Sequence, residues 1–289
     1  MRSKKAIQRD ILNNWPRIMR KAGTIPVLPP KSPTLLGSST KTRKGPRKYE
    51  TRVVYMSPDR EAMLPGDTRT LCANASERCS FLCLGHSTGL LITSSSHRAR
   101  LWKTALFLGD RALFRELLDA EVRGFARACD RAGTIPVVRV DGSSDTGEGK
   151  LSAIRNPSVQ HYDYTKIGAR VMRRGIARKL PANYSLTLSY SGENGAEILS
   201  AVRAGVSVAV VVDADPRRKA TELIPSELNL AGVSVAVVDG DTDDLRFRDP
   251  IGSAVLLRFK SARNRSRALA TAGAFVVQLA TPDAWELAS

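Results

Sequence analysis

The sequence lacks the features that mark membrane-spanning, secreted and common nucleotide-binding proteins. In 289 residues, no apolar run approaches the roughly 18 that a membrane span needs. The basic N-terminus has no apolar stretch behind it, so we expect no signal peptide. The pattern Gly-x-Gly-x-x-Gly and a Walker motif are both missing, which argues against a doubly wound nucleotide-binding sheet.

Two catalytic signatures are also missing. The chain has three histidines, and no two of them form the pair separated by one hydrophobic residue that is typical of rolling-circle nickases. It has no Gly-x-Ser-x-Gly nucleophile elbow either. Acidic residues are scarce relative to basic ones, because 28 Asp and Glu face 45 Lys and Arg, which gives a formal charge of +17. Such a charge attracts polyanions, so nucleic acid is the expected partner and a membrane is not.

Against these absences, one stretch concentrates ligand chemistry. Cys72, Cys79 and Cys83 lie within twelve residues. Thiolate sulfur is a soft ligand that selects zinc, copper(I) or iron–sulfur clusters. Bunched thiols favour metal chemistry in a reducing cytoplasm over a secreted disulfide framework. We therefore predict that the three thiols hold one metal centre.

The ligand count leaves the identity of that centre open. Three thiols suit a [4Fe–4S] cluster with one open iron site, or a Cys3His zinc site completed by His86 or His97. The simpler alternative is one loop disulfide and an inert thiol. Cys129 follows apolar residues at helical spacing and is interpreted as a small buried hydrophobe.

Residues 1–50 are predicted to form a basic, partly extended N-terminal arm. They contain thirteen Lys or Arg against Asp10 and Glu50, a local charge of +11. A helix is expected over Lys4–Lys21, and Pro26 to Pro46 is typical of an extended segment. The arm could bind the phosphate backbone of nucleic acid, or it could wrap around its own domain.

From residue 51 to 289 we predict a single α/β domain that contains the cysteine loop. An amphipathic helix is expected over residues 110–132, and further helices are expected at Ile167–Arg178, Gly195–Ala204 and Arg217–Leu223. Expected strands are Arg52–Met56, Val137–Val140, Val159–Tyr162, Ser185–Ser189, Val206–Val212, Val233–Val238, Ser253–Lys260 and Ala274–Leu279. Apolar strands that alternate with helices indicate a parallel sheet covered by helices. The predicted fold is a complete or partial parallel βα barrel.

Polar residues follow several of these strands, at the sheet edge where ligands bind in such folds. Asp141 and Asp145 flank a Gly142-Ser143-Ser144 turn that could accept hydrogen bonds from a ligand, or only satisfy its own backbone. Asp163, Tyr164 and Lys166 could supply acid–base groups or phosphate contacts, or form an ordinary strand end with a solvated lysine.

Three further groups of side chains have open interpretations. Asp239, Asp241, Asp243 and Asp244 could bind magnesium or form a solvated acidic turn. His161 is interpreted as a structural histidine. We predict nucleic-acid binding with strong salt dependence and little sequence preference. The predicted binding residues are those of the N-terminal arm together with Arg170, Arg173, Arg174 and Arg178.

Six stretches occur in an order that resembles the gene-product-88-like family of phage and prophage proteins. The resemblance covers Arg52 to Leu279 and implies a protein in the cytoplasm of a bacterial host. The stretches are Leu71–Ser76, Cys79–Leu84, Val138–Asp145, Tyr162–Lys166, Leu180–Tyr184 and Val238–Asp241.

The arrangement is more distantly similar to radical S-adenosylmethionine enzymes. That likeness implies a [4Fe–4S] cluster on Cys72, Cys79 and Cys83 whose open iron binds S-adenosylmethionine. It further implies that residues 141–145 orient this cofactor and that Tyr164 and Lys166 face the substrate. The usual cysteine spacing is three and then two residues, whereas here it is six and then three, so zinc stays open. The favoured function is an enzyme of this kind acting on nucleic acid or a nucleotide. The alternative is a zinc-stabilised nucleic-acid-binding or replication-accessory protein.

Overall fold

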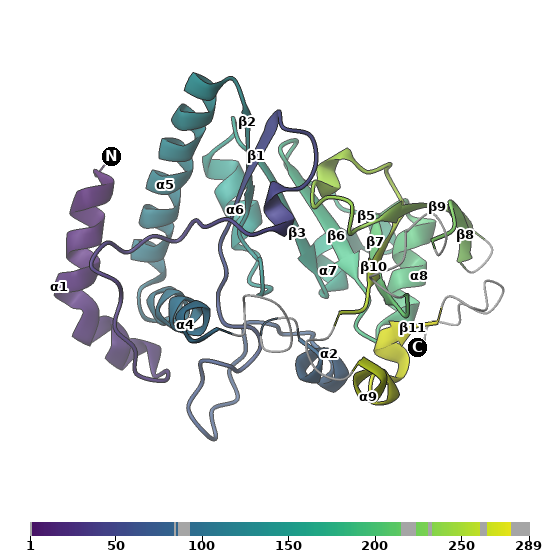
Figure 1. The fold of residues 1–289 in the computed structure, drawn as a ribbon, viewed down its shortest axis with the longest axis horizontal. Coiled ribbons are helices and arrows are strands. Elements are labelled where there is room, and N and C mark those ends of the chain that lie inside the picture. The colour runs from purple at the N-terminus through teal and green to yellow at the C-terminus, as the bar shows by residue number, and fades with distance from the viewer. Residues whose placement is uncertain are drawn as a thin grey trace. The chain divides into compact units, whose positions relative to one another are not determined.

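The computed structural model describes residues 2–83, 85, 93–214, 224–230, 233–260 and 265–278 (Figure 1). The chain divides into two compact units, which we call the first and the second unit. The first comprises Met1–Cys72, Leu90–Asp163 and Pro181–Tyr184, and the second comprises Ala73–Gly89, Tyr164–Leu180 and Ser185–Ser289. This division crosses the predicted boundary at residue 51, because the N-terminal residues belong to the first unit.

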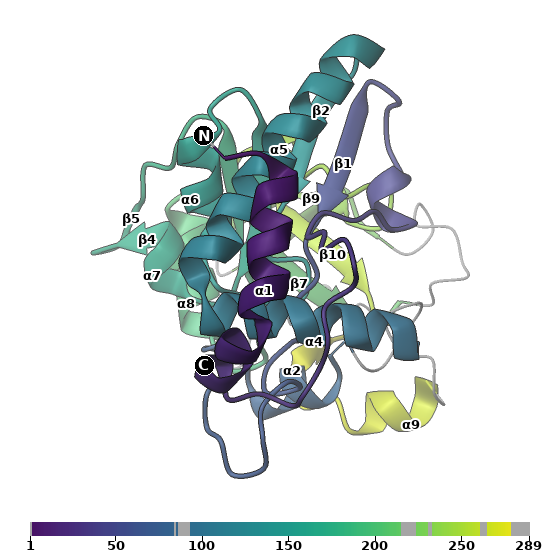
Figure 2. The same ribbon diagram turned by 90° about the vertical axis from the view of Figure 1, so that its left-hand side faces the viewer.

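Helix α1 (Lys4–Ala22) begins at Ser3, whose side chain accepts a hydrogen bond from the Ala6 N–H, and ends at Gly23, where φ is 58°. Its apolar face is buried and consists of Ile7, Ile11, Trp15, Ile18 and Ala22. That face packs with α4 (Ser94–Gly109) and α5 (Arg111–Ala132), and Figure 2 shows α1 running alongside α5. The predicted helix over Lys4–Lys21 is therefore confirmed, and it is part of a core.

The segment after α1 is held against the first unit by two buried charged residues. The Glu121 carboxylate accepts the N–H groups of Leu35 and Leu36 at 3.0 and 2.8 Å, and the Lys103 ammonium donates to the Leu35 carbonyl at 2.8 Å. A short helix, η1 (Lys41–Arg43), follows. These residues wrap around their own unit, and phosphate binding by them stays a prediction.

The strands of the first unit are β1 (Tyr49–Val53), β2 (Ile135–Arg139) and β3 (Gln160–Thr165), the last of which belongs to this unit as far as Asp163. Strand β2 pairs in parallel with both β1 and β3. Helix α6 (Glu148–Arg155) connects β2 to β3. The three strands thus lie side by side in chain order.

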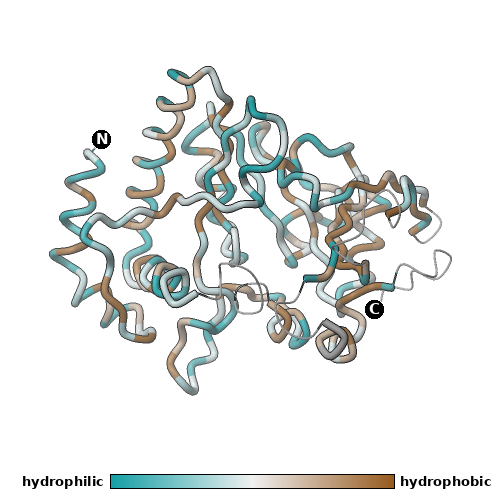
Figure 3. The backbone as a smooth tube through the Cα atoms, viewed as in Figure 1, coloured by the Kyte–Doolittle hydropathy of each residue, from teal (hydrophilic) through white to brown (hydrophobic). Residues whose placement is uncertain are grey.

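The second unit contains a second run of parallel strands, in the order β6-β7-β10-β9-β8. In this run of described strands β8 is antiparallel to β9, and the other pairings, including that of β11 with β7, are parallel. The apolar strands β7 and β10, brown in Figure 3, supply much of its core. The elements are α2 (Glu77–Phe81), α7 (Gly168–Val171), β4 (Met172–Arg173), β5 (Ile176–Ala177), β6 (Tyr184–Ser189), α8 (Gly195–Arg203), β7 (Val208–Val212), β8 (Glu227–Leu230), β9 (Val233–Asp239), η4 (Arg246–Arg248), β10 (Ala254–Arg258), α9 (Arg265–Ala270), η5 (Gly273–Phe275) and β11 (Val276–Val277).

The fold is mixed α/β with mostly parallel strands, as predicted. In the first unit the parallel strands are neighbours in chain order, as in a βα barrel. In the second unit β10 lies between β7 and β9, so the strand order departs from chain order. Among the described residues neither strand path returns to its first strand, so a closed barrel is not formed and a partial parallel fold remains.

One predicted helix is wrong. Residues 167–178 form only the short α7 and then a hairpin of β4 and β5, because Arg174 and Gly175 both have positive φ, 51° and 77°, which a helix cannot accommodate. The predicted helix Arg217–Leu223 lies outside the described residues. No helix in the part of the chain that the structure describes has the length and hydropathy of a membrane span.

Candidate functional site

Cys72 belongs to the first unit, and hydrogen bonds connect it to Asp59 and Thr70. The Asp59 N–H donates to the Cys72 sulfur at 3.3 Å, and Asp59 has a left-handed φ of 44° that aims this N–H. The Asp59 carboxylate accepts from the Thr70 hydroxyl at 2.8 Å, and that hydroxyl oxygen accepts from the Cys72 N–H at 2.9 Å. Hydrogen bonds of this kind surround the ligand atoms of many metal sites.

The loop after β2 lies directly against this thiol. The Cys72 sulfur is 4.0 Å from the Ser143 carbonyl oxygen, and the Asp145 N–H donates to the Leu71 carbonyl at 2.8 Å. The Ser143 hydroxyl donates to the Met56 carbonyl at 2.5 Å. Within the first unit, the structure therefore brings the first predicted metal ligand and the predicted cofactor-binding turn together.

The Asp141 carboxylate is occupied within its own loop. It accepts from the Ser144 hydroxyl at 2.7 Å, from the Thr146 N–H and hydroxyl at 3.0 and 2.8 Å, and from the Gly147 N–H at 2.9 Å. Asp141 and Ser144 are buried. Of the two predicted interpretations, this geometry favours a turn that satisfies its own backbone, with Asp145 as its more exposed carboxylate.

Asp163 supports this loop from β3. Its carboxylate accepts the Asp141 N–H at 2.7 Å and lies 3.3 Å from the Tyr184 hydroxyl. Complete burial raises the pKa of Asp163 well above its usual range, and the nearby charge of Asp141 raises it further. Gly149 packs so closely that an added Cβ would lie 1.7 Å from an Asp163 carboxylate oxygen. Asp163 is thus a buried structural carboxyl group.

Gly142 is needed for its small size. An added Cβ would lie 2.6 Å from the Val53 side chain and 2.8 Å from the Val54 carbonyl oxygen, and the Gly142 N–H donates to that same carbonyl at 3.0 Å. The residue therefore lets the loop after β2 pack against the chain that leaves β1.

Cys79 and Cys83 belong to the second unit. Cys79 lies on α2, whose N-cap Ser76 accepts the Cys79 N–H at 3.1 Å and donates to the Ser191 carbonyl in the loop after β6. Upstream, the Asn74 side chain donates to the Lys166 carbonyl at 3.4 Å. The cysteine segment is therefore fastened to Lys166 and Ser191 of its own unit. The Cys83 sulfur accepts the Gly85 N–H at 3.4 Å.

The donor chemistry fits a thiolate-bound metal, but no ligand set is assembled in the described residues. All four cysteines are free thiols, so the alternative of one loop disulfide is not formed. Within the described ranges, no group of three or more His, Cys, Asp or Glu is placed to hold a metal ion. His86 lies outside those ranges, and the His97 Nε2 atom is 3.8 Å from a Glu61 oxygen. Burial raises the pKa of the Cys129 thiol, as expected of an inert core residue.

Tyr164 lies near the end of β3, and Lys166 directly follows that strand. Both residues belong to the second unit, and both are half-buried. Tyr164 lies close enough to the buried Arg246 to affect the pKa of its guanidinium. Burial lowers the pKa of Arg246, but Tyr164 and the carboxylates of Asp249, Asp244 and Asp243 together raise it above its ordinary value. The predicted acid–base roles of Tyr164 and Lys166 stay predictions.

The aspartates after β9 are paired with arginine and lysine of the same unit, which favours the interpretation as an acidic turn. Asp241 contacts the Arg258 guanidinium at 3.2 Å and the Lys260 ammonium at 2.5 Å, and Asp243 contacts Arg246 at 3.3 Å. His161 is structural, as predicted. It is fully buried between the Ser152 hydroxyl at 3.0 Å and the Val159 carbonyl at 2.9 Å, and burial lowers its pKa to about 4.

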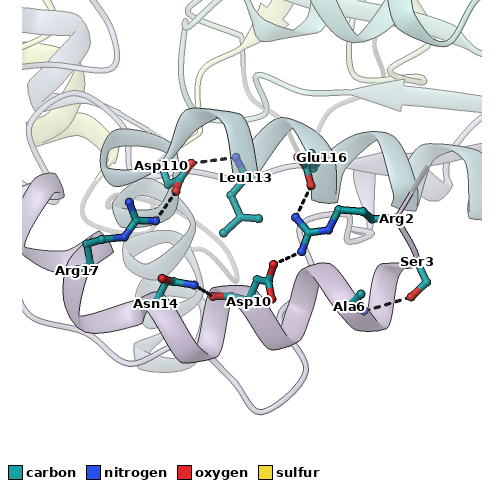
Figure 4. A network of polar contacts seen from close by, with 9 residues as sticks. All are labelled: Arg2, Ser3, Ala6, Asp10, Asn14, Arg17, Asp110, Leu113 and Glu116. Atoms are coloured by element: carbon teal, nitrogen blue, oxygen red, sulfur yellow. Dashed lines mark hydrogen bonds and ion pairs between the residues drawn. The ribbon is translucent and has the colours of Figure 1, made fainter.

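The four predicted nucleic-acid-binding arginines differ in exposure. Arg173, Arg174 and Arg178 are exposed on and beside the β4–β5 hairpin, whereas Arg170 on α7 is half-buried. Basic residues at α1 are partly paired within their own unit, and Figure 4 shows Arg17 contacting Asp110 at 3.0 Å and Arg2 contacting Glu116 at 3.0 Å. The hairpin is therefore the more accessible of these two basic surfaces.

Sequence reasoning missed Asp59 and Thr70, which surround the Cys72 thiol, and the support that Asp163 gives to the Asp141 loop. No local pattern announces these contacts, since they join residues 11 to 22 positions apart. The hairpin had only a weak signal, because Gly175 suits a positive φ but Arg174 is not among the residues that usually precede glycine in a two-residue hairpin turn.

A family model described as Gene product 88 matches residues 34–272, which is 239 of the 289 residues. The chain belongs to this family. The match includes all four cysteines, the Asp141–Asp145 loop and the hairpin, and it begins earlier than the resemblance over Arg52 to Leu279. No curated protein and no solved structure matches the chain at a significant level.

Proposed function

We propose that this phage-family protein is an iron–sulfur enzyme similar to radical S-adenosylmethionine enzymes, working in the host cytoplasm with nucleic acid or a nucleotide as its substrate. Cys72, Cys79 and Cys83 would hold the cluster. The parallel strands β1, β2 and β3 of the first unit follow chain order, and this supports the proposal, because the enzymes it resembles carry their cysteines after the first strand of a βα barrel.

The observation that carries the proposal is the position of Cys72. Its thiol receives the Asp59 N–H at 3.3 Å and lies 4.0 Å from the Ser143 carbonyl, so the first cysteine of the loop meets the turn after the next parallel strand. A backbone donor of this kind would stabilise a thiolate ligand.

The residues of the chain would have distinct tasks. The Asp59 N–H would stabilise the Cys72 sulfur as a cluster ligand, and the Thr70 hydroxyl donates to the Asp59 carboxylate. Asp145, which is more exposed than Asp141, would orient the amino group of S-adenosylmethionine. Bound together, the cluster and cofactor would supply reductive cleavage of the sulfonium, and Tyr164 and Lys166 would face the substrate.

Anaerobic purification with iron, sulfide and zinc analysis tests the metal. We expect about four iron and four sulfide per chain and a broad visible absorbance. Cys83→Ser should lose both, while Cys129→Ser, which changes a buried thiol outside the loop, should keep them. Protein without metal or sulfide, and equally stable after Cys83→Ser, would contradict the proposal.

Reconstituted and reduced protein should cleave S-adenosylmethionine to 5′-deoxyadenosine, and Asp145→Asn should weaken binding of the cofactor. The second candidate is a non-catalytic, zinc-stabilised nucleic-acid-binding protein, which the exposed arginines of the hairpin favour. One zinc per chain with no cleavage would leave that candidate in place of the enzyme.

A further inference from the structure

The β4–β5 hairpin is a short antiparallel ribbon with two distinct faces. Arg173 pairs with Ile176, and Met172 pairs with Ala177. Directly paired residues point to the same side of a sheet, and successive residues point to opposite sides. Met172 packs against the core of the second unit, so Arg173 and Ile176 share the outward face. This register explains why the Ile176 side chain is 71% exposed.

The turn gives the hairpin a defined shape. Its two central residues, Arg174 and Gly175, have φ of 51° and 77°, which is typical of a type I′ turn that matches the twist of paired strands. The Arg178 N–H donates to the Val171 carbonyl at 2.7 Å, and the Arg178 Nε donates to the Met172 carbonyl at 3.1 Å. In Figure 2 the hairpin projects beside α7.

The surface of this ribbon is strongly basic. Arg173, Arg174, Arg178 and Lys179 are all exposed and lie within seven residues. In the described part of the chain no ion pair is recorded for any of these four, whereas Arg17 and Arg2 near α1 contact carboxylates of the same unit. Their charges are thus available to an external anion.

We propose that the β4–β5 hairpin is a nucleic-acid-binding ribbon, in which the four cations contact successive phosphates and Ile176 packs against a base or sugar. Guanidinium groups match phosphate oxygens with two parallel hydrogen bonds. Nucleic acid fits better than a lipid surface, because interfacial binding needs a broad apolar face and this ribbon exposes one large apolar side chain among four cations.

This proposal locates the surface on which the proposed enzyme would bind its nucleic-acid substrate, and in that respect it rests on the proposed function. The binding of nucleic acid to the hairpin does not itself require the cluster. A hairpin variant carries Arg173→Gln, Arg174→Asn, Arg178→Gln and Lys179→Gln, with asparagine chosen because it tolerates a left-handed φ. The matched control removes four exposed cations of α1 with Lys5→Gln, Arg9→Gln, Arg20→Gln and Lys21→Gln. Both variants lower the formal charge from +17 to +13.

Binding to a labelled single strand and its duplex is measured from about 50 to 200 mM salt. The hairpin variant should lose roughly tenfold or more in affinity, and its slope of log K against log salt should become shallower by about 3. The helix variant should keep most of the affinity and slope. Vesicles that contain phosphatidylserine serve as the competing anionic surface, and thermal melting confirms that both variants fold.

Equal losses in the two variants, unchanged binding by the hairpin variant, or binding to vesicles in preference to both nucleic acids would each overturn the proposal. Iron and sulfide are measured on the same preparations. A hairpin variant that keeps its cluster but loses nucleic acid supports the ribbon, and a Cys83→Ser protein that loses metal but binds the strand separates this result from the proposed enzyme.

Discussion

Two basic segments of this protein, helix α1 and the β4–β5 hairpin, use positive charge differently. Helix α1 buries Ile7, Ile11, Trp15, Ile18 and Ala22, so most of its contribution is to the core of the first unit. The hairpin packs against the core of the second unit through Met172, and it exposes Ile176 and its cations. A basic composition therefore does not identify a binding surface. What identifies one is charge on an element whose side chains have little role in packing.

The neighbouring carboxylates sharpen the contrast. Asp110 contacts Arg17 and also caps α5 by accepting the Leu113 N–H at 3.1 Å, so this cation takes part in joining two helices (Figure 4). Surface ion pairs of this kind contribute little free energy, but they reduce the field available to a distant anion.

The largest predicted difference between the segments is in unfolding free energy. Ile11 is fully buried on α1, and Ile11→Ala should lower the stability of the protein by about 2–5 kcal/mol because it leaves a cavity. The same change at the 71% exposed Ile176 should alter stability by less than about 0.5 kcal/mol. Urea titration measures both. Equal effects would mean that α1 is not part of the core.

Replacing a glycine that packs against α1 should destabilise the protein more than replacing a glycine of the hairpin. A Cβ at Gly109 would lie 2.2 Å from the Ile18 carbonyl oxygen, so Gly109→Ala should push α1 from α4 and cost about 2–3 kcal/mol. At Gly175 an added Cβ meets nothing within 4 Å, and only the positive φ is strained, so Gly175→Ala should cost about 1 kcal/mol. Thermal melting of the two variants, with Arg174→Asn as a neutral control, checks the order.

A smaller effect should appear in the pH dependence. Burial lowers the pKa of Lys103 from 10.5 to about 8, and Glu121 offsets part of this shift. Between those values the unfolded chain binds more protons than the folded chain, so the contribution of Lys103 to stability should rise with pH, by at most about 1.4 kcal/mol per pH unit. Denaturant titrations from pH 8 to 10 should show this slope in the wild type and less of it in Lys103→Met. An identical slope in both proteins would exclude Lys103 as its source.

The sequence predicted most strands and helices because their patterns are local. The apolar period of α1, the run of valines in β7 and the helix closed by Gly133 each determine an element without reference to the rest of the chain. The residues from 167 to 178 were misread as a helix, since a two-residue turn at Arg174-Gly175 outweighed helical spacing.

The candidate site was only partly predictable. The sequence located Cys72 and the Asp141–Asp145 loop, and the structure places these two side by side in the first unit. It could not reveal that the Asp141 carboxylate accepts hydrogen bonds from its own loop, or that the Asp59 N–H donates to the Cys72 sulfur. Such contacts depend on how distant segments pack, and that information has no period or spacing in the chain.

The most direct test of the contrast between α1 and the hairpin is a cross-linking map. The wild-type protein is bound to a single strand that contains bromodeoxyuridine, irradiated, digested and analysed by mass spectrometry. We predict cross-linked peptides from residues 168–180, with few or none from residues 4–22. Cross-links concentrated on residues 4–22, with the hairpin unmodified, would contradict the account.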